Sequence, residues 1–170
     1  MSILRITKYG EKVLHRKARP VSDLGPDTLK LIQDMFETMY VANGVGLAAP
    51  QVGIPLRLAV INVTPEIKNN QFVIINPQIV KKEGVIESEE GCLSLPGVGG
   101  SKVKRYRRVT VTALNEKGMP IEITGEGLLS SCLQHEIDHL EGRLIIDRSG
   151  WKRRFEMMWA IRRLKKEKLW

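Results

Sequence analysis

Long apolar runs are missing from this sequence of 170 residues. No stretch approaches the roughly 20 consecutive apolar residues that a helix needs to cross a bilayer. The N-terminal residues also lack the charged-then-apolar pattern of a secretory signal peptide. Both absences favour a cytoplasmic protein, and the length favours one domain, residues 1–170, built around one hydrophobic core.

Cysteine and histidine are scarce, with two and three residues respectively. Two cysteines cannot form the dense disulfide framework of a small secreted domain. In a reducing compartment, Cys92 and Cys132 suit metal binding or burial as free thiols better than pairing with each other. Among the histidines, His15 has no partner at ligand spacing, so we expect it to be an exposed polar residue.

Acidic residues are outnumbered, which leaves a formal net charge of +8. Residues 151–170 hold eight Lys or Arg and two Glu, a net +6, so only +2 remains for the rest of the chain. The basic excess therefore belongs to one C-terminal segment and is not a property of the whole fold.

The other two histidines form the most informative pattern, the His-Glu-x-x-His of residues 135–139. Residues four apart lie on one face of a helix, so His135 and His139 can both reach a single metal ion. Glu136 follows the first ligand and can address a metal-bound water without being a ligand itself. We expect a metal-binding helix over residues 125–141; a solvated helix face with chance spacing is the alternative.

A catalytic site of this kind needs a third protein ligand and leaves a fourth position for water. Cys132 shares the helical stripe of the histidines but lies about 7.5 Å along the axis from the level of the metal. A cysteine sulfur reaches only about 5 Å, metal bond included, so we expect Cys132 to line the cavity instead. Cys92 lies in an irregular segment flanked by Gly and Pro and is the preferred third ligand, with a free buried thiol as the alternative.

The order of the remaining elements predicts the fold class. Residues 1–23 look irregular, and a helix opens at Pro26 and ends at Asn43-Gly44. Strands are expected over residues 56–63, 72–80, 84–89, 103–114, 119–124 and 144–147, with a hairpin turn at 115–118. A last helix covers residues 150–168. This order predicts an α+β domain in which antiparallel sheets pack around the central metal-binding helix, with further helices at the N-terminus and C-terminus.

Residues 44–51, Gly-Val-Gly-Leu-Ala-Ala-Pro-Gln, are dense in small side chains, which let a backbone approach another group closely. The segment lacks the lysine and the following helix of a phosphate-binding loop. It is either a tight structural turn or the wall of a substrate cleft with Gln51 as its one polar side chain. Gln51 and backbone N–H groups near Leu93 could stabilise the oxyanion formed when water attacks an amide or ester carbonyl.

Three segments resemble the signature motifs of peptide deformylases, in the same order and spacing: residues 44–51, residues 90–94 (Glu-Gly-Cys-Leu-Ser) and residues 134–140 (Gln-His-Glu-Ile-Asp-His-Leu). The resemblance covers nearly the whole chain. It implies removal of the N-formyl group from N-formyl-methionyl nascent polypeptides, with release of formate.

The same resemblance implies roles for individual residues. The implied metal ligands are Cys92, His135 and His139. Glu136 takes a proton from the metal-bound water and passes it to the leaving amine, while Gln51 and the Leu93 amide hold the oxyanion. Substrate contacts fall to Val45, Gly46, Gly91, Leu128 and Cys132, the last two in the methionine pocket. The implied metal is Fe²⁺, with Ni²⁺, Co²⁺ or Zn²⁺ able to occupy the site, whereas ligand chemistry alone favours zinc.

One position departs from the family pattern. Where many deformylases carry an arginine, this chain has Gly99. The departure puts a peptide-positioning role at this point in doubt, and the candidates to compensate for it are Lys102, Arg105 and Arg107.

Two other classes of protein fit parts of the sequence. A general His-Glu-x-x-His metallopeptidase usually takes its third ligand downstream, where nothing after His139 is as convincing as Cys92. A basic RNA-binding protein with a structural metal would close the site with a fourth protein ligand and would not need Glu136.

The C-terminal helix is expected to dock through Trp151, Phe155 and Met158, with Ile161 and Leu164 drifting off that face beyond Ala160. Charge on all sides suits RNA phosphates better than a membrane surface. The resemblance implies ribosome docking through this basic helix, with a merely solvated end as the alternative. No membrane or DNA partner is expected.

Overall fold

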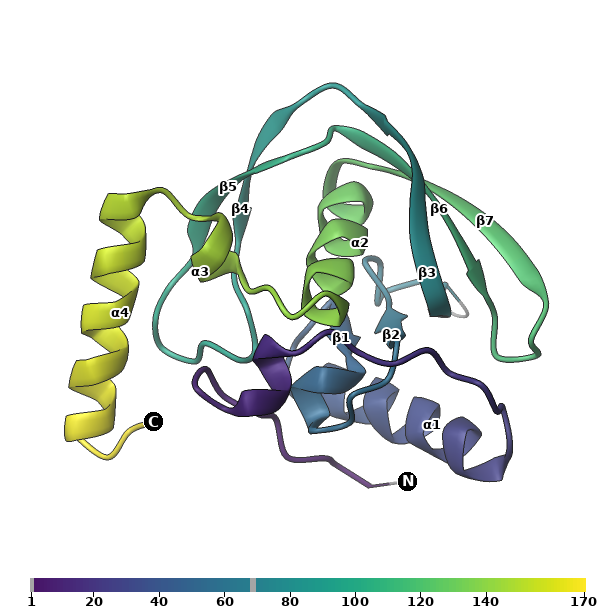
Figure 1. Cartoon of the computed structure of the whole chain (residues 1–170), viewed down its shortest axis with the longest axis horizontal. Coiled ribbons are helices and arrows are strands. Elements are labelled where there is room, and N and C mark those ends of the chain that lie inside the picture. The colour runs from purple at the N-terminus through teal and green to yellow at the C-terminus, as the bar shows by residue number, and fades with distance from the viewer. Residues whose placement is uncertain (1, 68–69) are drawn as a thin grey trace.

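Two antiparallel sheets fold over one buried helix in the computed structural model, which describes residues 2–67 and 70–170 (Figure 1). The five-stranded sheet has the order β1-β2-β3-β6-β7, and β4 pairs with β5. The strands are β1 Gly46–Ala48, β2 Leu58–Ile61, β3 Phe72–Glu83, β4 Ile86–Glu90, β5 Ser101–Arg105, β6 Arg108–Leu114 and β7 Pro120–Glu126. The α-helices are α1 Pro26–Val41, α2 Gly127–Leu140, α3 Ile145–Arg148 and α4 Trp151–Lys166, and the 3-10 helices are η1 Lys12–His15 and η2 Ala49–Val52.

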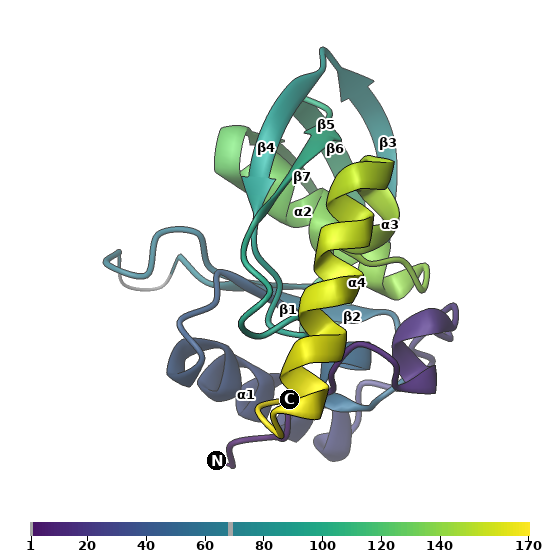
Figure 2. The ribbon, with the colours of Figure 1, turned by 90° about the vertical axis from the view of Figure 1, so that its left-hand side faces the viewer.

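The two sheets are joined into an arch over α2 (Figures 1 and 2). Strand β3 continues into β4 past Gly84, whose φ of 59° favours glycine, and β5 continues into β6. The expected α+β architecture, with antiparallel sheets around the helix that carries His-Glu-x-x-His and helices at both ends, is confirmed. The β6–β7 hairpin is also present, with Leu114 paired to Pro120.

The expected single strand over residues 103–114 is wrong, because the chain bends at Tyr106 and forms β5 and β6 instead. Side chains of α2 form hydrogen bonds with the N–H and the carbonyl of Tyr106, the groups that a continuous strand would use to pair with its neighbour. Gln134 Oε1 accepts from the Tyr106 N–H at 2.9 Å, and Gln134 Nε2 and Ser130 Oγ donate to its carbonyl at 3.0 and 2.9 Å. The bend is therefore bonded to the metal-binding helix itself.

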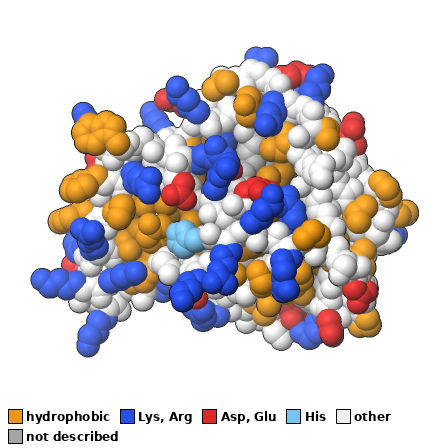
Figure 3. Space-filling model, viewed as in Figure 1, with side chains coloured by type: hydrophobic (Ala, Val, Ile, Leu, Met, Phe, Trp, Pro, Cys, Tyr) orange, Lys and Arg blue, Asp and Glu red, His pale blue; other side chains and the backbone are white. Residues whose placement is uncertain are grey.

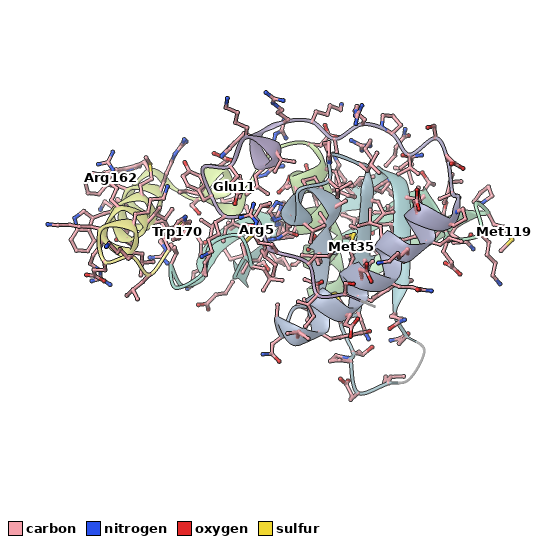
Figure 4. All side chains as sticks on the ribbon, turned by 90° about the horizontal axis from the view of Figure 1, so that it is seen from below. Arg5, Glu11, Met35, Met119, Arg162 and Trp170 are labelled. Atoms are coloured by element: carbon pink, nitrogen blue, oxygen red, sulfur yellow. The ribbon has the colours of Figure 1, made fainter. Side chains whose placement is uncertain are left out.

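The core is divided among three apolar clusters. In the first, α2 packs Leu133, Ile137 and Leu140 against the five-stranded sheet. In the second, α1 packs Met35 and Met39 against the opposite side of that sheet, and Met35 lies well inside the molecule (Figure 4). The third lies between the N-terminal segment, the segment after Cys92 and the C-terminal helices, and is formed by Leu14, Leu95, Val98, Leu144, Ile145, Ile146, Met157 and Ile161.

Residues 144–147 do not form the expected strand; Ile145–Arg148 is the single-turn helix α3. Asp147 stabilises the turn, since its Oδ2 accepts from the Leu144 N–H at 3.0 Å and its own N–H donates to the Leu144 carbonyl. Three consecutive apolar residues are too few to show a helical period, which is why the sequence pattern pointed to a strand.

The docked face of α4 also differs from the expectation. Trp151 and Phe155 are 78% and 70% exposed, whereas Met157 and Ile161 are buried and Leu164 packs beside them. The helix therefore turns its aromatic side outward and keeps contact with the body beyond Ala160. Across the described residues, no helix is long and apolar enough to span a membrane.

Candidate metal-dependent active site

The central feature of the site is a group of three side chains from two parts of the chain. Cys92 Sγ lies 3.3 Å from His139 Nε2, and His139 Nε2 lies 3.2 Å from His135 Nε2. The ligand atoms all lie within 4.8 Å of one another. Cys132 is outside this group: its thiol points to the Val45 carbonyl at 3.6 Å, and burial raises the pKa of that thiol. The structure thus separates the two cysteines as the axial-distance argument predicts.

The group has the donor set and spacing of a tetrahedral metal site. Nitrogen and sulfur ligands about 2.0–2.3 Å from a tetrahedral ion lie about 3.3–3.6 Å from each other. The two distances of 3.2 and 3.3 Å lie at or just below this edge length. Burial lowers the pKa of His139 well below its usual value. His135 is also buried, but its hydrogen bonds with Cys92 and Glu90 outweigh burial and raise its pKa. The residues therefore fit a divalent metal ion.

A buried ionic network fixes His135 from behind, and sequence reasoning assigned no role to it. His135 Nδ1 lies 3.0 Å from Glu90 Oε2, and the Arg105 guanidinium donates to both oxygens of Glu90 at 2.7 and 2.8 Å. Arg105 also donates to Asp138 of α2 at 2.6 Å. Burial opposes ionisation of Glu90, but the hydrogen bonds from Arg105 and His135 outweigh it and lower the pKa of Glu90 to about 2.

The network orients the ring of His135, a candidate metal ligand, through the contact with the Glu90 carboxylate. Carboxylate–histidine contacts of this kind orient metal ligands at catalytic sites. The only hint in the sequence is that Glu90 stands two residues before Cys92. Arg105 is held at both ends of its guanidinium and only 4% exposed. The expectation that it could compensate for Gly99 is therefore wrong.

Glu136 follows His135 in α2 and lines the cavity beside the ligand group. The side chain is buried, and Oε2 has no hydrogen-bond partner among the described residues. Burial raises the pKa of Glu136 to about 7. Gly46 makes room for this carboxylate, because a Cβ at that position would lie 2.8 Å from Cys132 Sγ and closer still to Glu136 Oε1. The close approach explains a glycine in the first motif.

Gln51 faces the ligands from η2. Its Oε1 accepts from the Ala48 N–H at 2.8 Å, which turns its Nε2 toward Cys92 Sγ at 3.8 Å and Ser94 Oγ at 3.4 Å. The amide is buried and so held in one orientation. It presents a hydrogen-bond donor toward the metal-binding group.

A cavity of about 350 Å³ opens beside these groups. Residues 44–51, which form β1 and η2, supply one of its walls, so of the two alternatives for this segment the structure supports the cleft wall. Predicted site residues that line the cavity are Val45, Gly46, Gln51, Gly91, Cys92, Leu93, Leu128, Cys132, His135 and Glu136. Lining residues that sequence reasoning missed include Asn43, Ser88, Glu89 and Ser131. His15 is exposed, as expected.

Known proteins match this chain over nearly its full length. The family model described as polypeptide deformylase matches residues 3–154. The chain is 52% identical over 149 residues to a peptide deformylase of Thermodesulfovibrio yellowstonii, covering 87% of this chain and 90% of that protein.

Solved structures agree. A Legionella pneumophila peptide deformylase superposes with a TM-score of 0.90 at 48% identity, covering 98% of this chain and 96% of that one. The Thermotoga maritima peptide deformylase gives a TM-score of 0.82 at 40% identity and covers 88% of this chain and 99% of its own. The chain therefore belongs to the polypeptide deformylase family, enzymes that hydrolyse a formyl amide.

Proposed function

We propose that this enzyme removes the formyl group from formyl-methionine at the N-terminus of newly made polypeptides, in the cytoplasm where they are synthesised. One observation carries the proposal: Glu136, whose buried Oε2 has no hydrogen-bond partner among the described residues, lines a cavity together with Cys92 and His135 of the Cys-His-His group. A hydrolase needs this combination, because a proton must leave water and reach the amine within one site.

The cavity suits a formyl-methionyl end. Leu128 and Cys132 offer an apolar lining for the methionine side chain, and Val45, Gly46 and Gly91 offer backbone groups to an extended peptide. A volume of about 350 Å³ suits a terminal residue better than a long internal segment. This fit favours a deformylase over a general metallopeptidase.

Cys92, His135 and His139 would hold the metal, which we propose to be Fe²⁺ on family resemblance, with Zn²⁺, Ni²⁺ or Co²⁺ as substitutes. When bound, such a metal supplies Lewis-acid activation of water. Glu136 accepts the proton that water loses as its oxygen bonds to the formyl carbon. It returns that proton to the amine nitrogen as the C–N bond breaks, which leaves formate and a free N-terminus. A pKa of about 7 suits both transfers near neutral pH.

The developing oxyanion needs hydrogen-bond donors that are in place before the reaction. Gln51 Nε2 is oriented by the bond that its Oε1 accepts from Ala48, and the Leu93 N–H lies next to the proposed ligand Cys92. We assign the oxyanion to these two donors.

Cleavage assays on three matched peptides test the substrate assignment. A formyl-methionyl tripeptide should be hydrolysed with release of formate, while its acetyl analogue and a longer peptide with a blocked N-terminus should remain intact. Cleavage of an internal peptide bond, or no release of formate by the metal-loaded enzyme, would overturn the proposal.

We further propose that the outward face of α4 docks on ribosomal RNA. Trp151, Phe155 and Trp159 are exposed there, and hydrophobic and basic side chains lie interspersed over this part of the surface (Figure 3). Lys152 lies over the ring of Trp151 and Arg163 over the ring of Trp159. Mixed cationic and aromatic surfaces suit phosphates and unstacked bases. The substrate also emerges from the ribosome, so docking there would bring enzyme and substrate together.

Charge reversal tests the docking better than truncation, because Ile161 and Leu164 beyond Ala160 belong to the core. The variant Arg162→Glu/Arg163→Glu/Lys166→Glu should bind ribosomes more weakly and with a smaller dependence on salt, since fewer counterions are released. The control reverses three exposed lysines elsewhere, Lys82, Lys104 and Lys117. Equal ribosome binding by the two variants would reject α4 as the docking element.

A further inference from the structure

The segment that carries Cys92 depends on the C-terminal helices for its support. Residues 91–100 link β4 to β5 and contain four glycines, so this stretch has little intrinsic rigidity. Its apolar side chains Leu95 and Val98 are buried against Met157 and Ile161 of α4, and Cys92 packs against the same cluster. One of the three proposed metal ligands thus lies in a segment that shares an apolar cluster with α4, although α4 contributes no residue to the lining of the cavity.

Arg153 of α4 forms hydrogen bonds with the end of this segment. Its Nη2 donates to the Gly100 carbonyl at 2.6 Å and to the Val98 carbonyl at 3.3 Å. These carbonyls flank Gly99, whose φ is 78°, and a Cβ on Gly99 would lie 3.5 Å from the same nitrogen. The guanidinium is itself oriented by a 3.1 Å bond from Nη1 to Glu156.

Two neighbouring contacts fix the same stretch. Leu164 covers Gly97, with its Cδ1 3.4 Å from where a Cβ would stand. Ser149, between α3 and α4, places its Oγ 2.7 Å from Ser101 Oγ at the start of β5. The segment from Cys92 to β5 therefore contacts the C-terminal helices at several consecutive residues. Arg153 provides the charged contact among them.

We propose that Arg153 is a positioning residue for the metal centre: by binding the carbonyls on both sides of Gly99 it holds the segment that keeps the Cys92 sulfur against His135 and His139. A flexible segment must be ordered each time the metal binds, and that ordering weakens binding. With Arg153 in place, the segment is already ordered in the folded protein. Metal binding then costs less conformational entropy, and the metal is retained for longer.

Cobalt release from the full-length, Co²⁺-loaded protein tests this role, and it does not depend on deformylase activity. Arg153→Ala should release cobalt to a chelator about tenfold faster than the parent, a loss at the scale of one charge-assisted hydrogen bond. The matched control is Arg162→Ala, which removes the same charge from an exposed position of the same helix (Figure 4). The side chain of Arg162 has no hydrogen bond or ion pair among residues 2–67 and 70–170.

Two further readouts separate positioning from general stability. The thiolate-to-cobalt absorption should weaken or shift in Arg153→Ala and stay unchanged in Arg162→Ala. Arg153→Lys, which keeps a charged donor on a shorter reach, should release cobalt at an intermediate rate. Equal release rates and equal spectra for Arg153→Ala and Arg162→Ala would overturn the proposal, even if the metal-free Arg153→Ala protein melts at a lower temperature.

Discussion

Helices α2 and α4 are of similar length but use their side chains in opposite ways. In α2, every residue from Ser130 to Leu140 is buried, whereas in α4 only Met157 and Ile161 are. Polar side chains of α2 are buried at a cost that paired partners offset: Gln134 bonds Tyr106, Asp138 bonds Arg105, and His135 bonds Glu90. The cations of α4 other than Arg153 instead remain in solvent.

Function can therefore be changed without changing the fold more easily on α4 than on α2. Along residues 130–140 of α2 no face is exposed, so a substitution there affects the core, the bend at Tyr106 or the proposed metal ligands. On α4 the inner face packs against the segment that carries Cys92, and the outer face exposes Trp151, Phe155 and Trp159, which leaves it available to a partner.

The largest effect is expected at Glu136, the buried carboxylate of α2. Glu136→Gln keeps the shape but cannot accept a proton, and general-base catalysis contributes roughly 10²- to 10⁴-fold. Turnover of a formyl-methionyl peptide should fall by that factor, while the bound metal, measured by elemental analysis, should stay close to that of the parent. Full activity, or loss of the metal, would remove Glu136 from its proposed role.

The next effect in size concerns the free energy of unfolding, which two substitutions on opposite faces of α4 should change to different extents. Met157→Ala should lower the free energy of unfolding by about 2–5 kcal/mol, since it empties a fully buried position. Phe155→Ala, on the exposed face, should change it by no more than about 0.5 kcal/mol. Denaturant unfolding of the metal-loaded proteins measures both, and similar losses would mean that the helix docks differently.

A smaller effect is expected at Glu90, which orients His135 from the β4 end. Glu90→Gln keeps a hydrogen-bond acceptor but removes the charge that pairs with Arg105. Loss of such a partner behind a metal ligand typically lowers metal affinity about 10- to 100-fold. Competition with a chelator measures the change, and Glu89→Gln, one residue away and not in the network, is the control.

The spacing of residues along one helix made α2 and its two proposed metal ligands predictable from the sequence. His135 and His139 must share a face at any helical geometry, and rise per residue alone was enough to separate Cys132 from the metal. The second ligand segment was harder, because Cys92 is brought to α2 by the arch of β3–β4 and β5–β6.

What the sequence could not predict depends on contacts between distant residues. The bend at Tyr106 is caused by Gln134, 28 positions away, and the role of Glu90 rests on Arg105 and His135, 15 and 45 positions away. Trp151, Phe155 and Met158 suggested the wrong docked face because they share one side of the helix, although Met158 itself does pack against the third cluster. The surface formed by Leu95 and Val98 accepts Met157 and Ile161 instead.

The metal content of two cysteine variants decides which sulfur holds the metal with His135 and His139. Cys132→Ala, purified anaerobically, should keep close to one metal ion per chain and mainly lose affinity for the methionine side chain. Cys92→Ala should lose tight metal binding and activity together, because its sulfur is the one beside His139. Metal retained by Cys92→Ala and lost by Cys132→Ala would contradict the account.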